Sequence, residues 1–120
     1  MLHILLVDPH AVFRTALAVV LARHLDLPVI THAGTLAEGQ QHLLGMDLAV
    51  VDTELLDEGA DLVRALRGGS SQPRVVALAP ASMHEATWAA LEGVVDAVVS
   101  KAASLDELLD TLAPGHGGGQ

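Results

Sequence analysis

Short apolar runs alternate with longer segments of helical periodicity along the chain, and this alternation constrains the fold more than any other feature. The runs predicted as strands are residues 3–7, 28–32, 47–52, 74–79 and 96–100. The segments predicted as helices are residues 11–24, 35–44 and 58–67, a segment from Ser82 to Gly93, and a segment that begins after Ser104. Strands that are apolar on both faces suit a parallel sheet covered on either side by helices. We therefore expect a doubly wound α/β fold, with a five-stranded parallel sheet of order 2-1-3-4-5 flanked by five helices.

Three of the predicted helices begin with a capping box, in which a hydroxyl residue is followed three positions later by a glutamate. The pairs are Thr35 with Glu38, Ser82 with Glu85, and Ser104 with Glu107. In such a box the hydroxyl accepts a hydrogen bond from the backbone N–H three residues on, which satisfies one of the free donors at the helix start. The pattern predicts that these hydroxyl residues are the N-caps.

Length and composition indicate one domain with a short tail. A chain of 120 residues corresponds to a single domain, which we expect to span residues 1–113. Residues 114–120 are rich in proline and glycine and are typical of a flexible linker or tail.

The composition argues against several partners. No apolar run approaches the roughly 20 residues of a membrane span, and the first residues do not read as a signal peptide. A formal net charge of −9 without a basic stripe argues against direct nucleic-acid contact. The chain has no cysteine, which fits a reducing, cytoplasmic environment.

Charged residues follow three of the predicted strands at the end where such a sheet binds ligands. Asp8 ends the first strand, Asp52 ends the third and Lys101 follows the fifth. Each alone has an ordinary explanation, as a helix cap, the start of a solvated loop or a surface charge. Together, two carboxylates and an ammonium group suit a divalent cation and a phosphoryl group, and an aspartate can itself accept the phosphoryl group.

From about residue 3 to residue 112 the sequence resembles the receiver domains of bacterial two-component response regulators. Residues 4–14 (ILLVDPHAVFR) are similar to the opening of regulators with a helix-turn-helix output domain. Residues 47–52 (DLAVVD) and 94–101 (VVDAVVSK) match the strands that end in the phosphoacceptor aspartate and in the family's lysine. The resemblance implies a flavodoxin-like (CheY-like) fold and a role in phosphorelay signal transduction rather than an enzyme. It implies Asp52 as the phosphorylation site, Lys101 as the phosphoryl contact, and Mg²⁺ held by Asp8, Asp52 and the backbone carbonyl of Glu54.

The sequence also departs from the family's pattern at positions that matter for phosphorylation. Pro9 stands where the family has a second acid, which is the more direct metal ligand. Ala79 stands where a hydroxyl contacts the phosphoryl oxygen, and Val98 where an aromatic changes orientation. The loop over residues 53–59 lacks the usual proline and is one residue shorter, and Ala102 replaces a proline common after the lysine.

These departures predict a defective switch. A missing carboxylate weakens Mg²⁺, which uses few protein oxygens in strict octahedral geometry. A missing hydroxyl removes a hydrogen bond to a charged group, typically about 1.5–3 kcal/mol. We therefore expect Mg²⁺ binding to be weak or absent and phosphorylation of Asp52 to be impaired, unless Glu54, Asp57 or Glu58 supplies the missing carboxylate.

The resemblance implies a histidine kinase, a second copy of the chain in a homodimer, and a DNA-binding output domain in the full-length protein. The implied contact face is the fifth strand with its two flanking helices. Three hypotheses remain open: a receiver that acts by protein–protein contact without phosphate, a phosphoacceptor of low efficiency, and a pseudo-receiver that binds a small molecule. A flavodoxin-like enzyme is disfavoured, because no glycine-rich phosphate loop follows the first strand. The seven histidines show no paired ligand spacing, which predicts surface and core positions rather than a metal site.

Overall fold

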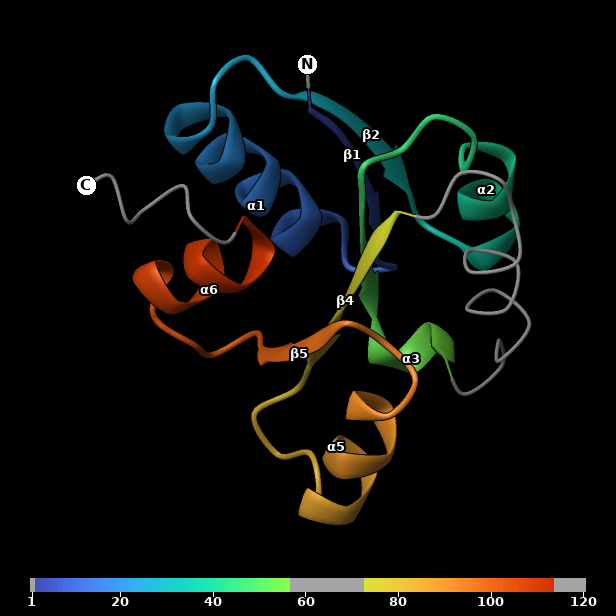
Figure 1. The fold of residues 1–120 in the computed structure, drawn as a ribbon, viewed down its shortest axis with the longest axis vertical. Coiled ribbons are helices and arrows are strands. Elements are labelled where there is room, and N and C mark those ends of the chain that lie inside the picture. Colours follow the sequence, from blue (N-terminus) through green and yellow to red (C-terminus); the bar gives the residue numbers. More distant parts are fainter. Residues whose placement is uncertain (1, 57–72, 114–120) are drawn as a thin grey trace.

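The computed structural model describes residues 2–56 and 73–113, which form one parallel sheet with helices on both faces (Figure 1). The strands are β1 (His3–Val7), β2 (Val29–Ala33), β3 (Leu48–Asp52), β4 (Arg74–Ala79) and β5 (Ala97–Ser100). The described helices are α1 (Ala11–His24), α2 (Leu36–Gln41), α3 (Thr53–Leu56), α5 (Glu85–Glu92) and α6 (Leu105–Leu112). The helix predicted over residues 58–67 and the tail over residues 114–120 lie outside the described residues.

The sheet has the predicted topology. Its strand order is β2-β1-β3-β4-β5, and all four neighbouring pairs are parallel. The predicted bounds of β1, β4 and α1 agree with the structure. The strands β3 and β5 each begin one residue later than predicted, and β2 is shifted by one residue at both ends. None of the helices within residues 2–56 and 73–113 is long and apolar enough to cross a membrane.

The central strands are apolar on both faces because helices cover both faces. Along β1, Ile4 and Leu6 join one core cluster, while Leu5 and Val7 join the other. The first cluster is completed by α1 and α6, which lie on the same side of the sheet in Figure 1. The second includes side chains from α2 and α3, on the opposite side. This alternation follows from the two-residue period of a strand, and it fixes the register of β1 within the sheet.

Two of the three predicted capping residues are N-caps. The hydroxyl of Thr35 accepts the N–H of Glu38, and the hydroxyl of Ser104 accepts the N–H of Glu107, both at 3.2 Å. The prediction for Ser82 is wrong. His84 is the N-cap of α5, and its ring nitrogen Nδ1 accepts the N–H of Ala86 at 3.1 Å.

Two helix predictions need correction. The second helix ends at Gln41 instead of residue 44, and the chain then turns through Gly45, whose φ of +81° favours glycine. The segment directly after Asp52 was predicted as a loop, yet Thr53–Leu56 forms the short helix α3. This turn begins where the Asp52 carboxylate accepts the N–H of Glu54, which satisfies a free donor at the helix start.

Candidate functional site

Two buried carboxylates lie side by side at the carboxyl edge of the sheet. Val7 of β1 pairs with Val51 of β3, so the next residues, Asp8 and Asp52, are neighbours at the strand ends. Asp8 is 2% exposed and Asp52 is 3% exposed. Two carboxylates removed from water at this separation repel each other unless a positive charge compensates them.

Each carboxylate is oriented by a backbone N–H two residues further along the chain. Asp8 Oδ1 accepts the N–H of His10 at 2.8 Å, and Asp52 Oδ1 accepts the N–H of Glu54 at 2.7 Å. These local hydrogen bonds form the turns by which each strand leaves the sheet. They also leave the second oxygen of each carboxylate, Oδ2, directed toward a third charged group.

That third group is the ammonium of Lys101, the only lysine of the chain. The backbone of Lys101 continues the β4–β5 ladder, because its N–H donates to the carbonyl of Ala79 at 2.8 Å. Its Nζ lies 2.8 Å from Asp8 Oδ2 and forms an even closer ion pair with Asp52 Oδ2. The ring of Phe13 lies below the ammonium, 4.5 Å from Nζ to the ring centroid, in the arrangement of a cation–π contact.

The two carboxylates hold Lys101 in its charged form. Burial alone lowers the pKa of Lys101, but the hydrogen bonds and negative charges of Asp52 and Asp8 outweigh it and raise the pKa above its ordinary value of 10.5. At neutral pH the pocket therefore contains two carboxylates and one charged ammonium.

His10 is a fourth polar group in this pocket, and the sequence analysis did not place it there. Its Nδ1 lies 3.0 Å from Asp8 Oδ1, 3.5 Å from Asp52 Oδ2 and 3.0 Å from the Nζ of Lys101. Its other ring nitrogen, Nε2, lies 3.6 Å from Glu54 Oε2. The sequence analysis predicted surface and core positions for the histidines, and His10 is indeed exposed, but its ring also lies beside the two buried aspartates. The signal was present as an aspartate and a histidine two residues apart, directly after a strand.

The chain is similar to known proteins in structure rather than in sequence. No family model matches the chain, and no curated protein matches it in sequence. A CheY-like response regulator receiver domain protein from Methanospirillum hungatei JF-1 superposes with a TM-score of 0.78 at 20% identity, over 98% of this chain and 95% of that one. The signal receiver domain of a DNA-binding response regulator from Colwellia psychrerythraea 34H superposes with a TM-score of 0.78 at 15% identity, over 92% and 94% of the two chains. The chain has the receiver-domain fold.

A third similar structure is relevant to the pocket. A response regulator from Burkholderia pseudomallei, whose structure has a phosphorylated aspartic acid, a calcium ion and citrate, matches with a TM-score of 0.77 at 21% identity. The match covers 98% of this chain and 70% of that protein. In the receiver-domain fold, the crevice beyond the strand ends at β1 and β3 is the topological switch point at which ligands bind.

The positions that depart from the receiver pattern lie around this crevice. Pro9 is exposed and has no side-chain donor atom. Ala79 is fully buried at the end of β4 and offers only its backbone carbonyl, which is bonded to Lys101. Val98 is half-buried and packs against the second core cluster. The receiver fold thus retains its charged groups on β1, β3 and β5, while the hydroxyl and aromatic positions carry apolar side chains.

The donor set fits a transition metal better than Mg²⁺. Asp8, His10 and Asp52 each offer a ligand atom, and these atoms lie within 4.8 Å of one another. Mg²⁺ prefers an octahedron of oxygen ligands, usually including several waters. Here a histidine nitrogen faces the site, Pro9 provides no oxygen, and the ammonium of Lys101 lies against the Oδ2 atoms of both carboxylates.

Among the acids considered as replacements for the missing carboxylate, only Glu54 lies in the described residues. Its side chain is 62% exposed and approaches His10, not the two aspartates. Asp57 and Glu58 lie outside the described residues. That Glu54 would offer its backbone carbonyl to a metal remains a prediction.

Proposed function

We propose that this chain is a receiver domain of a cytoplasmic response regulator that acts through protein–protein contacts, with impaired or absent Mg²⁺-dependent phosphorylation at Asp52. In this proposal it signals rather than catalyses, and it controls a transcriptional output domain in a longer protein. The observation that carries the proposal is the ammonium of Lys101 between Asp8 and Asp52, beside a position 9 that adds no carboxylate.

The charges in the pocket support impaired phosphorylation. A phosphoryl group on Asp52 adds negative charge beside Asp8, and Lys101 is the cation that contacts both carboxylates. Phosphoryl transfer depends on electrostatic stabilisation of the transferred group, which a divalent metal normally provides. With a metal site poor in oxygen ligands and no hydroxyl at Ala79, this pocket stabilises the transferred group weakly.

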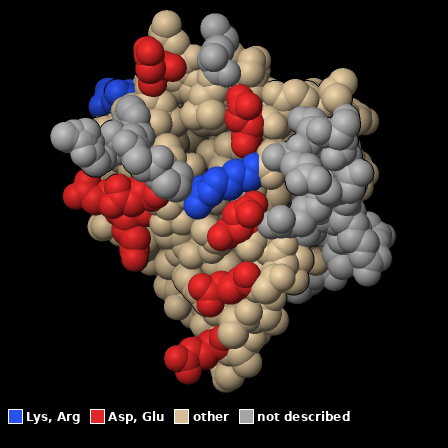
Figure 2. All heavy atoms as spheres, viewed as in Figure 1, with Lys and Arg blue, Asp and Glu red and all other residues tan. Residues whose placement is uncertain are grey.

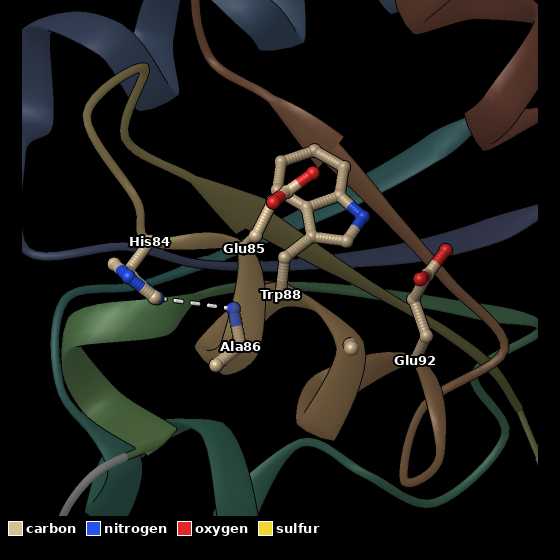
Figure 3. Close-up of a pocket in the computed structure, with 6 residues that line it drawn as sticks. His84, Glu85, Ala86, Trp88 and Glu92 are labelled. Atoms are coloured by element: carbon tan, nitrogen blue, oxygen red, sulfur yellow. Dashed lines mark hydrogen bonds between the residues drawn. The ribbon is translucent and has the colours of Figure 1, made fainter.

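The exposed surface around α5, β5 and α6 supports a role in protein contact. In the described part of the chain, α5 has no buried residue, and Val94 and Leu105 are 48% and 43% exposed. Glu85, Trp88 and Glu92 lie along one face of α5 and line an open pocket (Figure 3). We propose the face formed by α5, β5 and α6 as the contact surface for a second copy of the chain.

The similar structures support an output domain beyond this one. The chain covers 57% of ChrA, a response regulator of a heme-sensing two-component system, at a TM-score of 0.74 and 24% identity. It covers 25% of NtrX from Brucella abortus, at a TM-score of 0.77 and 18% identity. A domain of this fold therefore occurs as one part of longer proteins. Acidic side chains are spread over the surface in Figure 2, which disfavours nucleic-acid contact by the domain itself.

The test is Mg²⁺ binding by the purified chain, measured by calorimetry with and without beryllofluoride as a phosphoryl mimic. We expect weak or absent binding in both conditions. Incubation with a small phosphodonor and Mg²⁺, followed by mass spectrometry, should leave Asp52 largely unmodified. Tight binding of the mimic that requires Mg²⁺ would overturn the proposal.

One alternative has its own support in the structure. Asp52 is buried at the end of β3 and contacts Lys101, as a phosphoacceptor requires, so a slow phosphoacceptor served by a histidine kinase is the second candidate. It predicts slow but complete labelling of wild-type protein that is abolished in Asp52→Ala. A pseudo-receiver that binds a small molecule predicts instead a ligand-dependent rise in melting temperature that survives Asp52→Ala.

A further inference from the structure

The polar groups of the strand-end pocket are arranged around a shared centre. We propose that Asp8, His10 and Asp52 form a binding site for a divalent transition-metal ion of the zinc class, and that such an ion suits the pocket better than Mg²⁺ does. Two ligands about 2.1 Å from a tetrahedral zinc ion lie about 3.4 Å apart. The Nδ1 of His10 lies 3.0 Å from Asp8 Oδ1 and 3.5 Å from Asp52 Oδ2, so a common ion needs little movement.

The carboxylates are held in place for this role before any ion binds. Asp8 Oδ1 and Asp52 Oδ1 each accept a backbone N–H, which fixes the two carboxyl groups. Asp8 Oδ2 is a buried atom that accepts no hydrogen bond of good geometry from the described residues, and its close partner is the Lys101 ammonium. Two buried carboxylates carry more negative charge than the single ammonium of Lys101 offsets, and a coordinated cation would compensate the remainder.

His10 faces incompatible partners without a metal ion. Its Nδ1 lies 3.0 Å from a carboxylate that can only accept a hydrogen bond and 3.0 Å from an ammonium that can only donate one. One ring nitrogen cannot donate and accept in the same tautomer, so one contact stays unfavourable. A metal ion that displaces the ammonium removes the conflict, because the lone pair of Nδ1 and the oxygens of Asp8 and Asp52 then all point to the same cation.

Glu54 completes the arrangement from outside the ligand set. When Nδ1 of His10 binds a metal, its proton resides on Nε2, which lies 3.6 Å from Glu54 Oε2. Metal-binding histidines usually donate this second N–H to a carboxylate or carbonyl, which fixes the ring and strengthens the ligand. A small movement of the exposed Glu54 side chain makes that hydrogen bond.

The mixed donor set determines which metals fit. Imidazole suits Zn²⁺ and neighbouring transition metals, whereas carboxylate, carbonyl and water ligands suit Mg²⁺. The ammonium of Lys101 competes with any cation for the Oδ2 atoms of Asp8 and Asp52, so its removal should strengthen metal binding. This inference goes beyond the proposed function, because it holds whether or not Asp52 is phosphorylated.

The experiment titrates the metal-free 120-residue chain with Zn²⁺ and, separately, with Mg²⁺ by calorimetry. Loss of an outer-shell partner typically lowers metal affinity about 10–100-fold, and loss of a direct ligand should cost more. We therefore expect His10→Ala to lower Zn²⁺ affinity at least about 100-fold and Glu54→Gln to lower it about tenfold. Mg²⁺ affinity should be unchanged in both variants, and Lys101→Met should bind Zn²⁺ more tightly than wild type.

The matched control is His24→Ala, which removes an exposed histidine at the end of α1. It should leave Zn²⁺ binding unchanged. Circular dichroism would check that each variant is folded, and Co²⁺ absorption in the visible range would report nitrogen ligation that disappears in His10→Ala.

The outcomes separate this inference from the proposed function. Zn²⁺ binding that is equally strong in His10→Ala, or equally weakened in His24→Ala, would overturn the metal site and leave the proposed function intact. Tight Mg²⁺-dependent binding of beryllofluoride would overturn the proposed function. Zn²⁺ binding that depends on His10 would still establish the metal site in that case.

Discussion

The two halves of the sheet differ in how much polar chemistry they retain at the strand ends. On the side of β1 and β3, Asp8 and Asp52 are buried, oriented by backbone N–H groups and paired with Lys101. On the side of β4 and β5, Ala79 is buried and Val98 is half-buried, and both side chains are apolar.

The difference separates two tasks of a receiver domain: binding a charged group in the pocket, and passing that event on to a distant face. The side of β1 and β3 can still keep charged groups buried, because Asp8, Asp52 and Lys101 stabilise one another in a buried network. On the side of β4 and β5, Ala79 stands at the hydroxyl position and Val98 at the aromatic position of the receiver pattern. We therefore expect that binding in the pocket is only weakly transmitted to α5. The predictions below test that separation.

The largest effect should come from restoring the two polar groups that the receiver pattern has at positions 9 and 79. Pro9→Asp with Ala79→Ser adds a carboxylate ligand and a hydroxyl that hydrogen-bonds a charged group, the latter worth about 1.5–3 kcal/mol, or tenfold or more. We expect Mg²⁺ affinity and labelling of Asp52 by a small phosphodonor to rise by at least that factor. The same pair combined with Asp52→Ala should remain unlabelled. Wild-type protein that labels as fast as the repaired variant would remove the basis of the comparison.

Lys101→Met should produce the next largest effect, on stability. The substitution keeps most of the apolar length of the side chain but leaves the carboxylates of Asp8 and Asp52 facing each other without a cation. Removing one partner of a buried ion pair costs about 3–5 kcal/mol, and we expect about 2 kcal/mol here because the Lys101 side chain is 18% exposed. Urea unfolding would measure it.

The control for Lys101→Met is a second substitution in the same pocket. Adding Asp52→Asn removes one of the two like charges, so the double variant should recover part of the lost stability. If the double variant is less stable than Lys101→Met alone, the two carboxylates do not repel each other and the pocket is not the charge network described above.

The fold was predictable because the strand pattern is local and strong. Buried strands such as β3 and β4 are apolar throughout, and the convergence of Asp8, Asp52 and Lys101 follows from where parallel strands end. His10 was missed because its position depends on the turn that the Asp8 carboxylate makes with the N–H of His10. Histidine spacing alone does not carry that information.

The helix starts show the same limit at a smaller scale. Ser82 and Glu85 match a capping box, yet α5 begins two residues later because His84 accepts the N–H of Ala86. The short helix α3 was missed because it is four residues long and begins at a hydrogen bond from Glu54 to Asp52. Both outcomes rest on single side-chain contacts, which a pattern of apolar residues does not encode.

Alkaline pH should weaken the ion pairs of Lys101 with Asp8 and Asp52. The pKa of Lys101 is raised in the folded state, so its contribution to stability is complete below about 10.5, the ordinary pKa, and is lost as the pH rises through the raised value. The stability difference between wild type and Lys101→Met should therefore shrink above that pH. The chain has no tyrosine and no other lysine to obscure the effect. A difference that stays constant from neutral pH to beyond the raised pKa would contradict the ion-pair explanation.

The smallest expected effect is a fluorescence response at α5. Its absence would test directly whether binding in the pocket reaches the side of β4 and β5. Trp88 is the only tryptophan of the chain and lies on α5, so its emission reports that helix. In the variant repaired at Pro9 and Ala79, beryllofluoride with Mg²⁺ should bind yet leave the emission unchanged, because Val98 offers no ring to change orientation. Adding Val98→Phe should create a measurable change. A response before that addition would mean that the apolar path from the pocket to α5 already transmits the signal.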